Sequence, residues 1–183
     1  MILLTGGFPY SGKTKFAETL LDIVDNKWAI HIDPKKYLPD DFDTMYEGDR
    51  MMWMTSAWSI GYEKAEEAIK KLPNKALIIF DTTASKISSI KPLIKSAKEN
   101  DHKIIYVLVH AQLEDRIERT NDVNKLIELE KNYTYNLRTS IPIIKKMSDK
   151  FILIKNINGD PGQQAIRQGA DKIALYIKII RSQ

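Results

Sequence analysis

The stretch "GGFPYSGKT", residues 6–14, decides the fold that this sequence predicts. Gly7 to Thr14 fits the pattern Gly-x-x-x-x-Gly-Lys-Ser/Thr, directly after the apolar run "MILLT" and directly before residues with helical spacing. Glycines let a backbone approach an anion closely, and main-chain N–H groups of the loop and of the following helix surround phosphate oxygens. A strand, this loop and a helix, in that order, predict a nucleoside triphosphate site rather than only a tight turn.

Each residue type in this loop has a separate expected task. Lys13 adds a mobile positive charge to the main-chain N–H groups that face the phosphates. The Thr14 hydroxyl is an oxygen ligand for Mg²⁺, whose octahedral shell otherwise comes from phosphate oxygens and water. We therefore expect ATP and Mg²⁺ as cofactors, bound by Gly7, Tyr10, Ser11, Gly12, Lys13 and Thr14.

The composition limits the class of protein. A chain of 183 residues with 43% hydrophobic and 28% charged residues suits one α/β domain over 1–183. It has no cysteine, which excludes disulfides, thiolate metal sites and a cysteine nucleophile. A net charge of +4 fits an anionic partner or, equally, a lysine-rich solvated surface. Because no stretch of about 18 apolar residues occurs, we expect a soluble, unprocessed, cytoplasmic protein without membrane segments.

The rest of the chain alternates between apolar runs and helical patterns. Near-continuous apolar runs are typical of strands that helices cover on both faces of a parallel sheet. The order predicts an α/β fold of the P-loop NTPase or nucleotide kinase-like class, a three-layer doubly wound five-stranded parallel sheet with its ligands at the carboxyl ends of the strands. The expected strands are 1–5, 28–32, 76–80, 104–109 and 151–154; the expected helices are 13–25, 49–71, 86–100, 112–121, 123–147 and 162–181, with a loop over 33–49.

Two aspartates follow apolar runs and are therefore expected at the edge of the sheet that carries the loop. Asp81 ends "LIIFD", where it can hold Mg²⁺ directly or through water, or cap the next turn. Asp33 ends "AIHID", where it can accept a proton from an attacking hydroxyl and orient that hydroxyl toward the γ-phosphate. Alternatively, Asp33 and the following proline only initiate a turn.

These features together resemble the small P-loop kinases related to polynucleotide kinase. The resemblance is carried by "GFPYSGKT", by Asp33 after the second strand, by "FDTTAS" after the third and by an arginine-bearing segment after the fourth. It implies that the loop binds ATP, that Asp33 is the general base, and that arginines of a lid close over the transferring phosphate. It also implies a 5′-hydroxyl of DNA or RNA, or the hydroxymethyl group of a modified pyrimidine in phage DNA, as acceptor. A compact, lysine-rich chain fits a phage-encoded kinase that works in the host cytoplasm.

The lid is expected over about 112–140. Arg116 and Arg119 in "LEDRIERT" are three residues apart, which predicts that both lie on one face of a helix. Two guanidinium groups on one face can neutralise charge that develops on the γ-phosphate, although the same pattern also fits a salt-bridged surface helix. Arg138 on the next helix is a further lid and substrate-binding candidate, or a solvated helix end.

The acceptor side is expected over about 34–72, after the second strand. Arg50 is available there for an anionic group of the acceptor, alongside Asp33. Trp53 and Trp58 can stack on a base, although large apolar residues at helical spacing also fit a core. We therefore expect a nucleotide or nucleic-acid acceptor, with DNA among the candidates.

Two other functions fit part of the sequence. In a nucleoside monophosphate kinase the acceptor is an ionised phosphate, so Asp33 is not needed as a base. A regulatory NTPase also has a phosphate loop, but the sequence lacks the Asn-Lys-x-Asp element of guanine-specific switches. The pattern therefore favours a kinase that phosphorylates a hydroxyl group.

Overall fold

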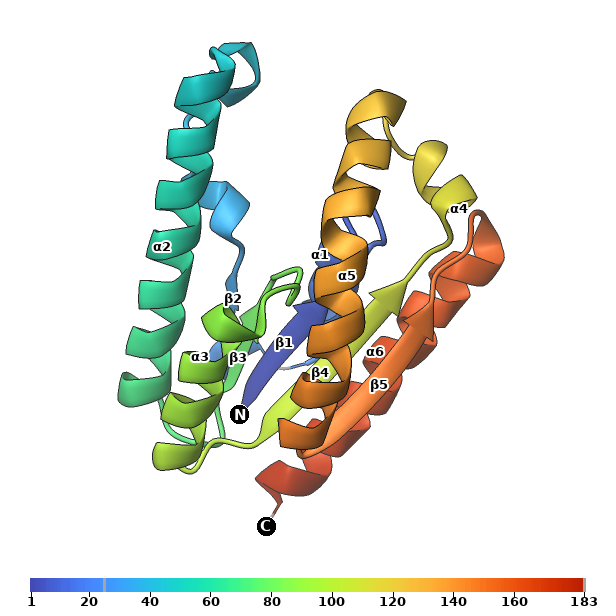
Figure 1. Ribbon diagram of the computed structural model, residues 1–183. Coiled ribbons are helices and arrows are strands. Elements are labelled where there is room, and N and C mark those ends of the chain that lie inside the picture. Colours follow the sequence, from blue (N-terminus) through green and yellow to red (C-terminus); the bar gives the residue numbers. More distant parts are fainter. Residues whose placement is uncertain (25, 183) are drawn as a thin grey trace.

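Five parallel strands form one sheet in the order β2-β3-β1-β4-β5 in the computed structural model, which describes residues 1–24 and 26–182 (Figure 1). Every neighbouring pair of strands is parallel, as the apolar runs predicted. This order places β1, which leads into the phosphate loop, between β3 and β4. The strands are β1 (Ile2–Gly6), β2 (Ala29–Ile32), β3 (Leu77–Phe80), β4 (Ile104–His110) and β5 (Lys150–Lys155).

The helices follow the predicted order, with differences at two places. The loop expected over 33–49 instead contains two 3₁₀ turns and the first residues of a helix, and the helix expected over 112–121 is much shorter. The last residue of the helix expected over 13–25 lies outside the described residues, as does residue 183 of the expected domain. The helices are α1 (Lys13–Ile23), α2 (Glu47–Lys71), α3 (Ile87–Glu99), α4 (Leu113–Ile117), α5 (Val123–Met147) and α6 (Asp160–Arg181); the 3₁₀ turns are η1 (Asn26–Trp28), η2 (Pro34–Tyr37) and η3 (Phe42–Thr44).

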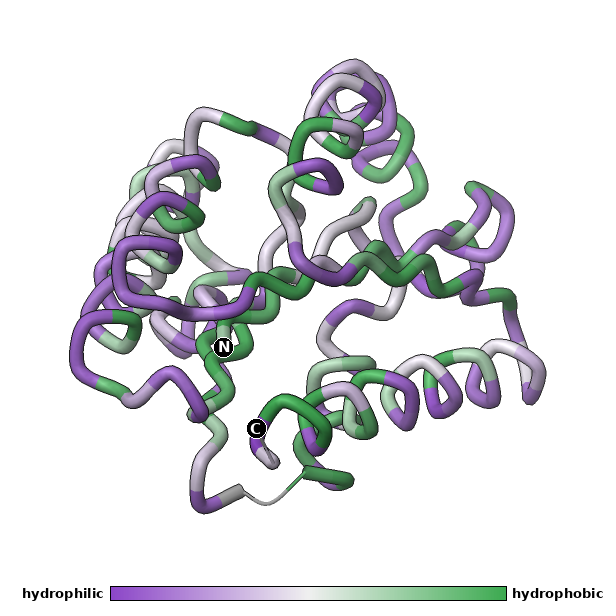
Figure 2. The backbone as a smooth tube through the Cα atoms, turned by 90° about the horizontal axis from the view of Figure 1, so that it is seen from below, coloured by the Kyte–Doolittle hydropathy of each residue, from purple (hydrophilic) through white to green (hydrophobic). Residues whose placement is uncertain are grey.

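The sheet separates two apolar cores. Side chains of a strand point alternately to the two faces, so Leu3 enters the core beneath α1 and α6, while Leu4 enters the core beneath α2, α3 and α5. Figure 2 shows the hydrophobic strands in the middle and the more hydrophilic outer turns of the helices around them. The central strands are apolar on both faces for this reason, which is why they are continuous apolar runs in the sequence.

The register of the sheet aligns the carboxyl ends of three neighbouring strands. Leu4 of β1 pairs with Phe80 of β3, and Phe80 pairs with Ile32 of β2. The residue that follows each of these positions therefore lies at the same level of the same edge. Those residues are Thr5, Asp81 and Asp33, which come from three distant parts of the chain.

Close packing of α2 fixes the position of η2, the turn that follows β2. Gly61 of α2 lies against Pro34 of η2, and a Cβ atom at position 61 would be 2.8 Å from Pro34 Cγ. Trp58, Tyr62 and Phe80 pack near this contact, with a centroid distance of 5.0 Å between the Tyr62 and Phe80 rings. Trp58 therefore packs against the core, which is one of the two alternatives that the sequence left open, whereas Trp53 is 38% exposed.

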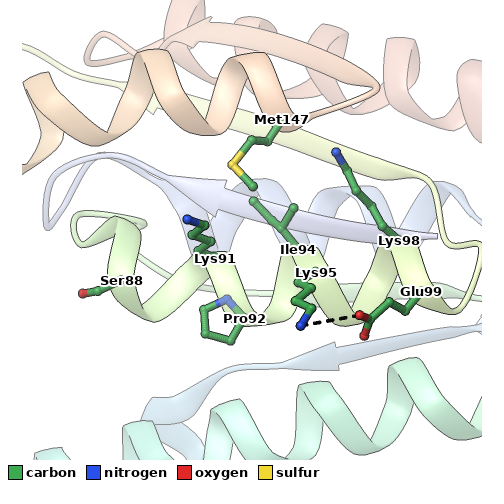
Figure 3. Close-up of a pocket in the computed structure, with 8 residues that line it drawn as sticks. All are labelled: Ser88, Lys91, Pro92, Ile94, Lys95, Lys98, Glu99 and Met147. Carbon is green, nitrogen blue, oxygen red and sulfur yellow. Dashed lines mark ion pairs between the residues drawn. The ribbon is translucent and has the colours of Figure 1, made fainter.

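A surface cavity of about 530 Å³ lies along α3, away from the phosphate loop (Figure 3). Its rim includes Lys91, Lys95 and Lys98, and its apolar lining includes Ile94 of α3 and Met147 of α5. Part of the lysine excess seen in the sequence is therefore concentrated on this face. Within residues 1–24 and 26–182, no helix combines the length and the apolar character that crossing a membrane requires.

The contact between Gly61 and Pro34 predicts an unequal effect of two glycine-to-alanine substitutions in α2. Gly61→Ala should lower the free energy of unfolding by about 1–3 kcal/mol, because the proline ring cannot rotate away from the new methyl group. Gly48→Ala is the matched control, since a Cβ atom there meets nothing within 4 Å and alanine favours the helix by up to about 1 kcal/mol. Chemical denaturation measures both; equal stabilisation by both substitutions would contradict the packing argument.

Candidate active site

The loop between β1 and α1 has the backbone geometry that an anion cradle requires. Gly7 has φ = 131° and Gly12, which caps the N-terminus of α1, has φ = 97°. A Cβ atom at Gly7 would lie 2.1 Å from the carbonyl oxygen of Val109, and one at Gly12 would lie 2.3 Å from Asn156 Nδ2. Both positions therefore require glycine for conformation and for space. Tyr10 also has a positive φ, of 61°.

Lys13 lies partly buried inside this loop. Its Nζ donates a hydrogen bond of 2.8 Å to the carbonyl oxygen of Phe8. Burial lowers the pKa of Lys13 to about 8, and the positive charges of Lys35 and Arg116 lower it further, whereas Asp81 and Asp33 oppose the shift. The charged form of Lys13 is therefore unfavourable in this position, and a bound anion would stabilise it. This is the arrangement expected of a phosphate-binding lysine.

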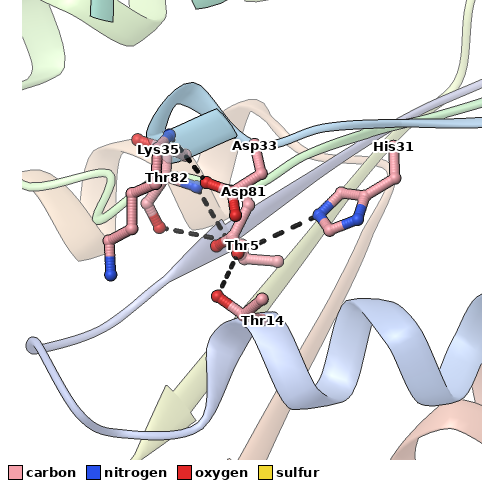
Figure 4. A network of polar contacts seen from close by, with 7 residues as sticks. All are labelled: Thr5, Thr14, His31, Asp33, Lys35, Asp81 and Thr82. Atoms are coloured by element: carbon pink, nitrogen blue, oxygen red, sulfur yellow. Dashed lines mark hydrogen bonds and ion pairs between the residues drawn. The ribbon is translucent and has the colours of Figure 1, made fainter. Parts of the chain in front are cut away.

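Thr14 and Asp81 bring a hydroxyl and a carboxylate together next to the loop (Figure 4). Thr14 Oγ1 donates a 2.5 Å hydrogen bond to Asp81 Oδ2, and Thr5 Oγ1 donates to Asp81 Oδ1 at 2.9 Å. A hydroxyl and a carboxylate so close together fit Mg²⁺, which takes few protein ligands and completes its shell with phosphate oxygens and water. In the described part of the chain, no cluster of three or more His, Asp and Glu side chains is placed to hold a metal by itself.

His31 of β2 lies beside the same carboxylate. Its Nε2 is 4.0 Å from Asp81 Oδ2 and, among the described residues, is buried without a hydrogen-bond partner. Burial lowers the pKa of His31, against the opposing charge of Asp81, so the ring is neutral near pH 7. The contact arises from the pairing of β2 with β3.

Asp33 begins the turn after β2, which is one of the two alternatives that the sequence left open, and its function as a base remains a prediction. It is 8% exposed and caps η2, with Oδ1 accepting a 3.0 Å hydrogen bond from the main-chain N–H of Lys35. This bond fixes the carboxylate and uses one of its two oxygens. Oδ2 is then the atom that can accept a proton at the same sheet edge as Thr14 and Asp81.

The expected helical face shared by Arg116 and Arg119 is not present. The helix α4 ends at Ile117, so Arg119 lies beyond it, and the two guanidinium groups have different partners. Arg116 is 1% exposed, lies 4.4 Å from the centre of the Phe8 ring and bonds Glu130 of α5 at 2.5 Å. Its Nη1 is buried without a partner within residues 1–24 and 26–182. Arg116 is therefore a buried residue beside the phosphate loop and not part of an exposed salt-bridged helix.

Arg119 connects the phosphate loop to the loop that follows β5. Its Nη1 donates to the carbonyl oxygen of Tyr10 at 3.2 Å, and its Nε donates to Asn158 Oδ1 at 2.8 Å. Asn156 adds a second connection, donating from Nδ2 to the carbonyl oxygen of Ser11 at 2.7 Å. Because asparagine is common in turns, no sequence pattern distinguished these side chains from ordinary turn residues.

The structure leaves Arg50 and Arg138 without partners at the site. Arg50 is half-buried in the first turns of α2, and Arg138 is exposed on α5. In the parts of the chain that are described, neither guanidinium group makes a hydrogen bond or an ion pair. The helices that carry them extend past the carboxyl ends of the strands on opposite sides of the phosphate loop (Figure 1). Their binding of an acceptor remains a prediction.

The loop after β3 links the site to α5. Ser140 of α5 is buried, and its Oγ lies 3.1 Å from each of the carbonyl oxygens of Ala84 and Ser85. The main-chain N–H of Gly7 donates to the carbonyl oxygen of Thr83 at 3.1 Å. The loop after β3 therefore lies between the phosphate loop and α5. None of these contacts was predicted, since a buried serine within a helix has no distinctive sequence pattern.

Comparison with known proteins gives relatives in structure and none in sequence. The sequence matches no protein-family model, and a search of curated proteins finds no match. Shikimate kinase from Acinetobacter baumannii in complex with shikimate is similar with a TM-score of 0.58 and 16% identity, over 100% of this chain and 94% of that one. Kti12 from Chaetomium thermophilum in complex with ADP-AlF₃ has a TM-score of 0.58 and 16% identity, over 97% of this chain and 99% of that one.

A third similar structure comes from the PezAT toxin–antitoxin system of Streptococcus pneumoniae. Its TM-score is 0.59 at 12% identity, over 97% of this chain and 86% of that one. At such low identities the similarity shows the fold alone. The chain therefore has the P-loop NTPase fold of nucleotide kinase-like proteins, as predicted from its loop and its strand order.

The lowered pKa of Lys13 predicts a pH dependence of nucleotide binding. Phosphate favours the charged lysine, so above pH 8 the free protein must take up a proton in order to bind. The affinity for Mg·ATP should fall only about twofold from pH 7 to 8 and then approach a loss of roughly tenfold per pH unit. Titration calorimetry between pH 7 and 9.5 measures this. Lys13→Ala should bind more weakly and without the dependence; the same slope in that variant would exclude Lys13 as its cause.

Proposed function

We propose that this protein is a Mg·ATP-dependent kinase that transfers the γ-phosphoryl group to a hydroxyl group. One observation carries the proposal: the candidate base Asp33 and the Thr14–Asp81 oxygen pair follow neighbouring strands at the edge that bears the phosphate loop. A buried carboxylate that a main-chain N–H holds in place beside this loop supports transfer to a hydroxyl group, because its second oxygen can accept the proton of the acceptor.

The reaction that these residues support is a displacement at the γ-phosphorus. Asp33 Oδ2 takes the proton of the acceptor hydroxyl, whose oxygen forms a bond to phosphorus. The bond between the γ-phosphorus and the oxygen that bridges to the β-phosphate breaks, and ADP leaves with that electron pair. The proton passes from Asp33 to solvent after the phosphorylated product departs. Charge is conserved, and no further reactant is needed.

The remaining residues of the loop bind and orient the nucleotide. The main-chain N–H groups from Gly7 to Thr14 face the phosphates, and Lys13 exchanges the carbonyl oxygen of Phe8 for a phosphate oxygen. Thr14 and Asp81 would hold Mg²⁺, which neutralises charge on the phosphate oxygens when bound. Arg116 and Arg119 flank the loop at Phe8 and Tyr10, where their charges support the γ- and β-phosphates.

The acceptor is proposed to bind beside η2 and the first turns of α2, within the segment 34–72. Arg50 at the start of α2 and Arg138 on α5 are the two cations proposed to bind an anionic group of the acceptor. A nucleotide or nucleic-acid hydroxyl is the acceptor class that the sequence resemblance implies, whereas shikimate kinase, one of the similar structures, is named for a small molecule. Both classes share the hydroxyl group that Asp33 would deprotonate.

Asp33→Asn should separate base catalysis from nucleotide binding. Asparagine keeps an oxygen for the N–H of Lys35 but cannot accept a proton, so kcat should fall by about 100- to 10,000-fold while ATP affinity changes little. Asp40→Asn, an exposed carboxylate in the same segment, is the matched control and should leave kcat unchanged. Steady-state kinetics and equilibrium ATP binding give the two quantities. Retained turnover in Asp33→Asn would point instead to an ionised phosphate acceptor, as in a nucleoside monophosphate kinase.

The acceptor class is identified by incubation with γ-labelled ATP and a panel of candidates. The panel contains DNA and RNA with 5′-hydroxyl ends, hydroxymethylpyrimidine DNA, nucleosides, nucleoside monophosphates and small hydroxylated acids. Labelling of a hydroxyl acceptor is the expected result. Steady hydrolysis without labelling of any acceptor would favour a regulatory NTPase over the kinase proposed here.

A further inference from the structure

The turn that carries the candidate base also carries two adjacent lysines. Asp33 caps η2, Pro34 begins it, and Lys35 and Lys36 follow. The turn is fixed by the bond from the Lys35 N–H to Asp33 Oδ1 and by a 3.1 Å bond from the Lys36 N–H to the Asp33 carbonyl oxygen. Contact between Pro34 and Gly61 of α2 holds the turn from outside. The directions of the two lysine side chains are therefore set by a rigid piece of backbone.

The two lysines project in different directions from this turn. A 3₁₀ helix has three residues per turn, so consecutive side chains are about 120° apart. Figure 4 shows the Lys35 side chain extending from η2 toward the phosphate loop. The charge of Lys35 is the strongest positive influence on Lys13 from any other side chain, stronger than that of Arg116, whereas the charge of Lys36 acts on His31. The Lys35 side chain thus extends toward the phosphate loop (Figure 4).

Phosphoryl transfer would be favoured by a positive charge between Asp33 and the γ-phosphate. The general base Asp33 is negative, and it must act beside a γ-phosphate that is itself negative, so the two repel each other. A cation on the acceptor side offsets this repulsion and stabilises the charge that spreads over the equatorial oxygens. Lys13 and the arginines approach from the side of the phosphate loop and of α4, which leaves the acceptor side to another residue.

We propose that Lys35 is a catalytic residue whose ammonium group contacts the γ-phosphoryl group from the acceptor side during its transfer. The exposed lysine has a long flexible stem and makes no hydrogen bond or ion pair through its side chain among the described residues. Its main-chain N–H binds Asp33, and a substitution of the side chain leaves that bond in place. This inference rests on the proposed function and assigns one further residue to it.

The test uses Lys35→Ala, Lys35→Arg and, as the matched control, Lys36→Ala, all in the full chain. Binding of ADP with aluminium fluoride, which mimics the transferring phosphoryl group, is compared with binding of ADP alone. Lys35→Ala should weaken the ADP–aluminium fluoride complex by about 10- to 100-fold and leave ADP affinity within twofold. Lys35→Arg should recover part of the loss. Lys36→Ala should bind both ligands as the unsubstituted protein does.

The kinetic prediction runs in parallel with the binding test. With an acceptor that the unsubstituted protein phosphorylates, Lys35→Ala should lower kcat by the same 10- to 100-fold and leave KM for ATP nearly unchanged. Equal effects of Lys35→Ala and Lys36→Ala, or an equal loss for ADP alone, would overturn the inference. If no acceptor is phosphorylated, the proposed function fails, while the aluminium fluoride measurement still decides whether Lys35 contacts the phosphoryl mimic.

Discussion

The pairing of β1 with β3 and of β3 with β2 is the constraint on which the site depends. It places Thr5, Asp81 and Asp33 at one level of one sheet edge, although they are separated by up to 76 residues in the sequence. The hydrogen bonds from Thr5 and Thr14 to Asp81 then join β1, α1 and β3 at the phosphate loop. A shift of one residue in this pairing would reverse the faces of the strand and remove Asp81 from Thr14.

The charges around the loop are arranged so that the cradle favours an anion. Burial disfavours the charged form of Lys13, and the positive charges of Lys35 and Arg116 disfavour it further. The negative charges of Asp81 and Asp33 favour the charged form but do not fully offset these effects, so the pKa of Lys13 is lowered. Arg116 differs from Lys13 and Lys35 because it forms an ion pair with Glu130. A triphosphate bound in the loop would therefore stabilise the charged form of Lys13, and a magnesium ion would stabilise the negative charge of Asp81.

The sequence was sufficient for features that local patterns specify. Continuous apolar runs gave the five strands, and the spacing around Gly7, Gly12 and Lys13 identified the phosphate loop. The sequence was insufficient where the direction of a side chain depends on tertiary packing. The early end of α4 separated Arg116 from Arg119, because burial against Phe8 and Glu130 outweighs helical spacing. Lys35 was missed because an irregular segment gives no indication of side-chain direction until its 3₁₀ turn is known.

Two contacts hold α5 against the loops of the site. Glu130 binds Arg116 beside the phosphate loop, and the Ser140 hydroxyl lies 3.1 Å from the carbonyl oxygens of Ala84 and Ser85 in the loop after β3, as well as 2.6 Å from the carbonyl oxygen of Asn136 in α5 itself. Glu130 and Ser140 are ten positions apart, which corresponds to about 15 Å along a helix. The Arg116–Glu130 ion pair and the Ser140 contact therefore both contribute to the position of α5 relative to the phosphate loop and to the loop after Asp81.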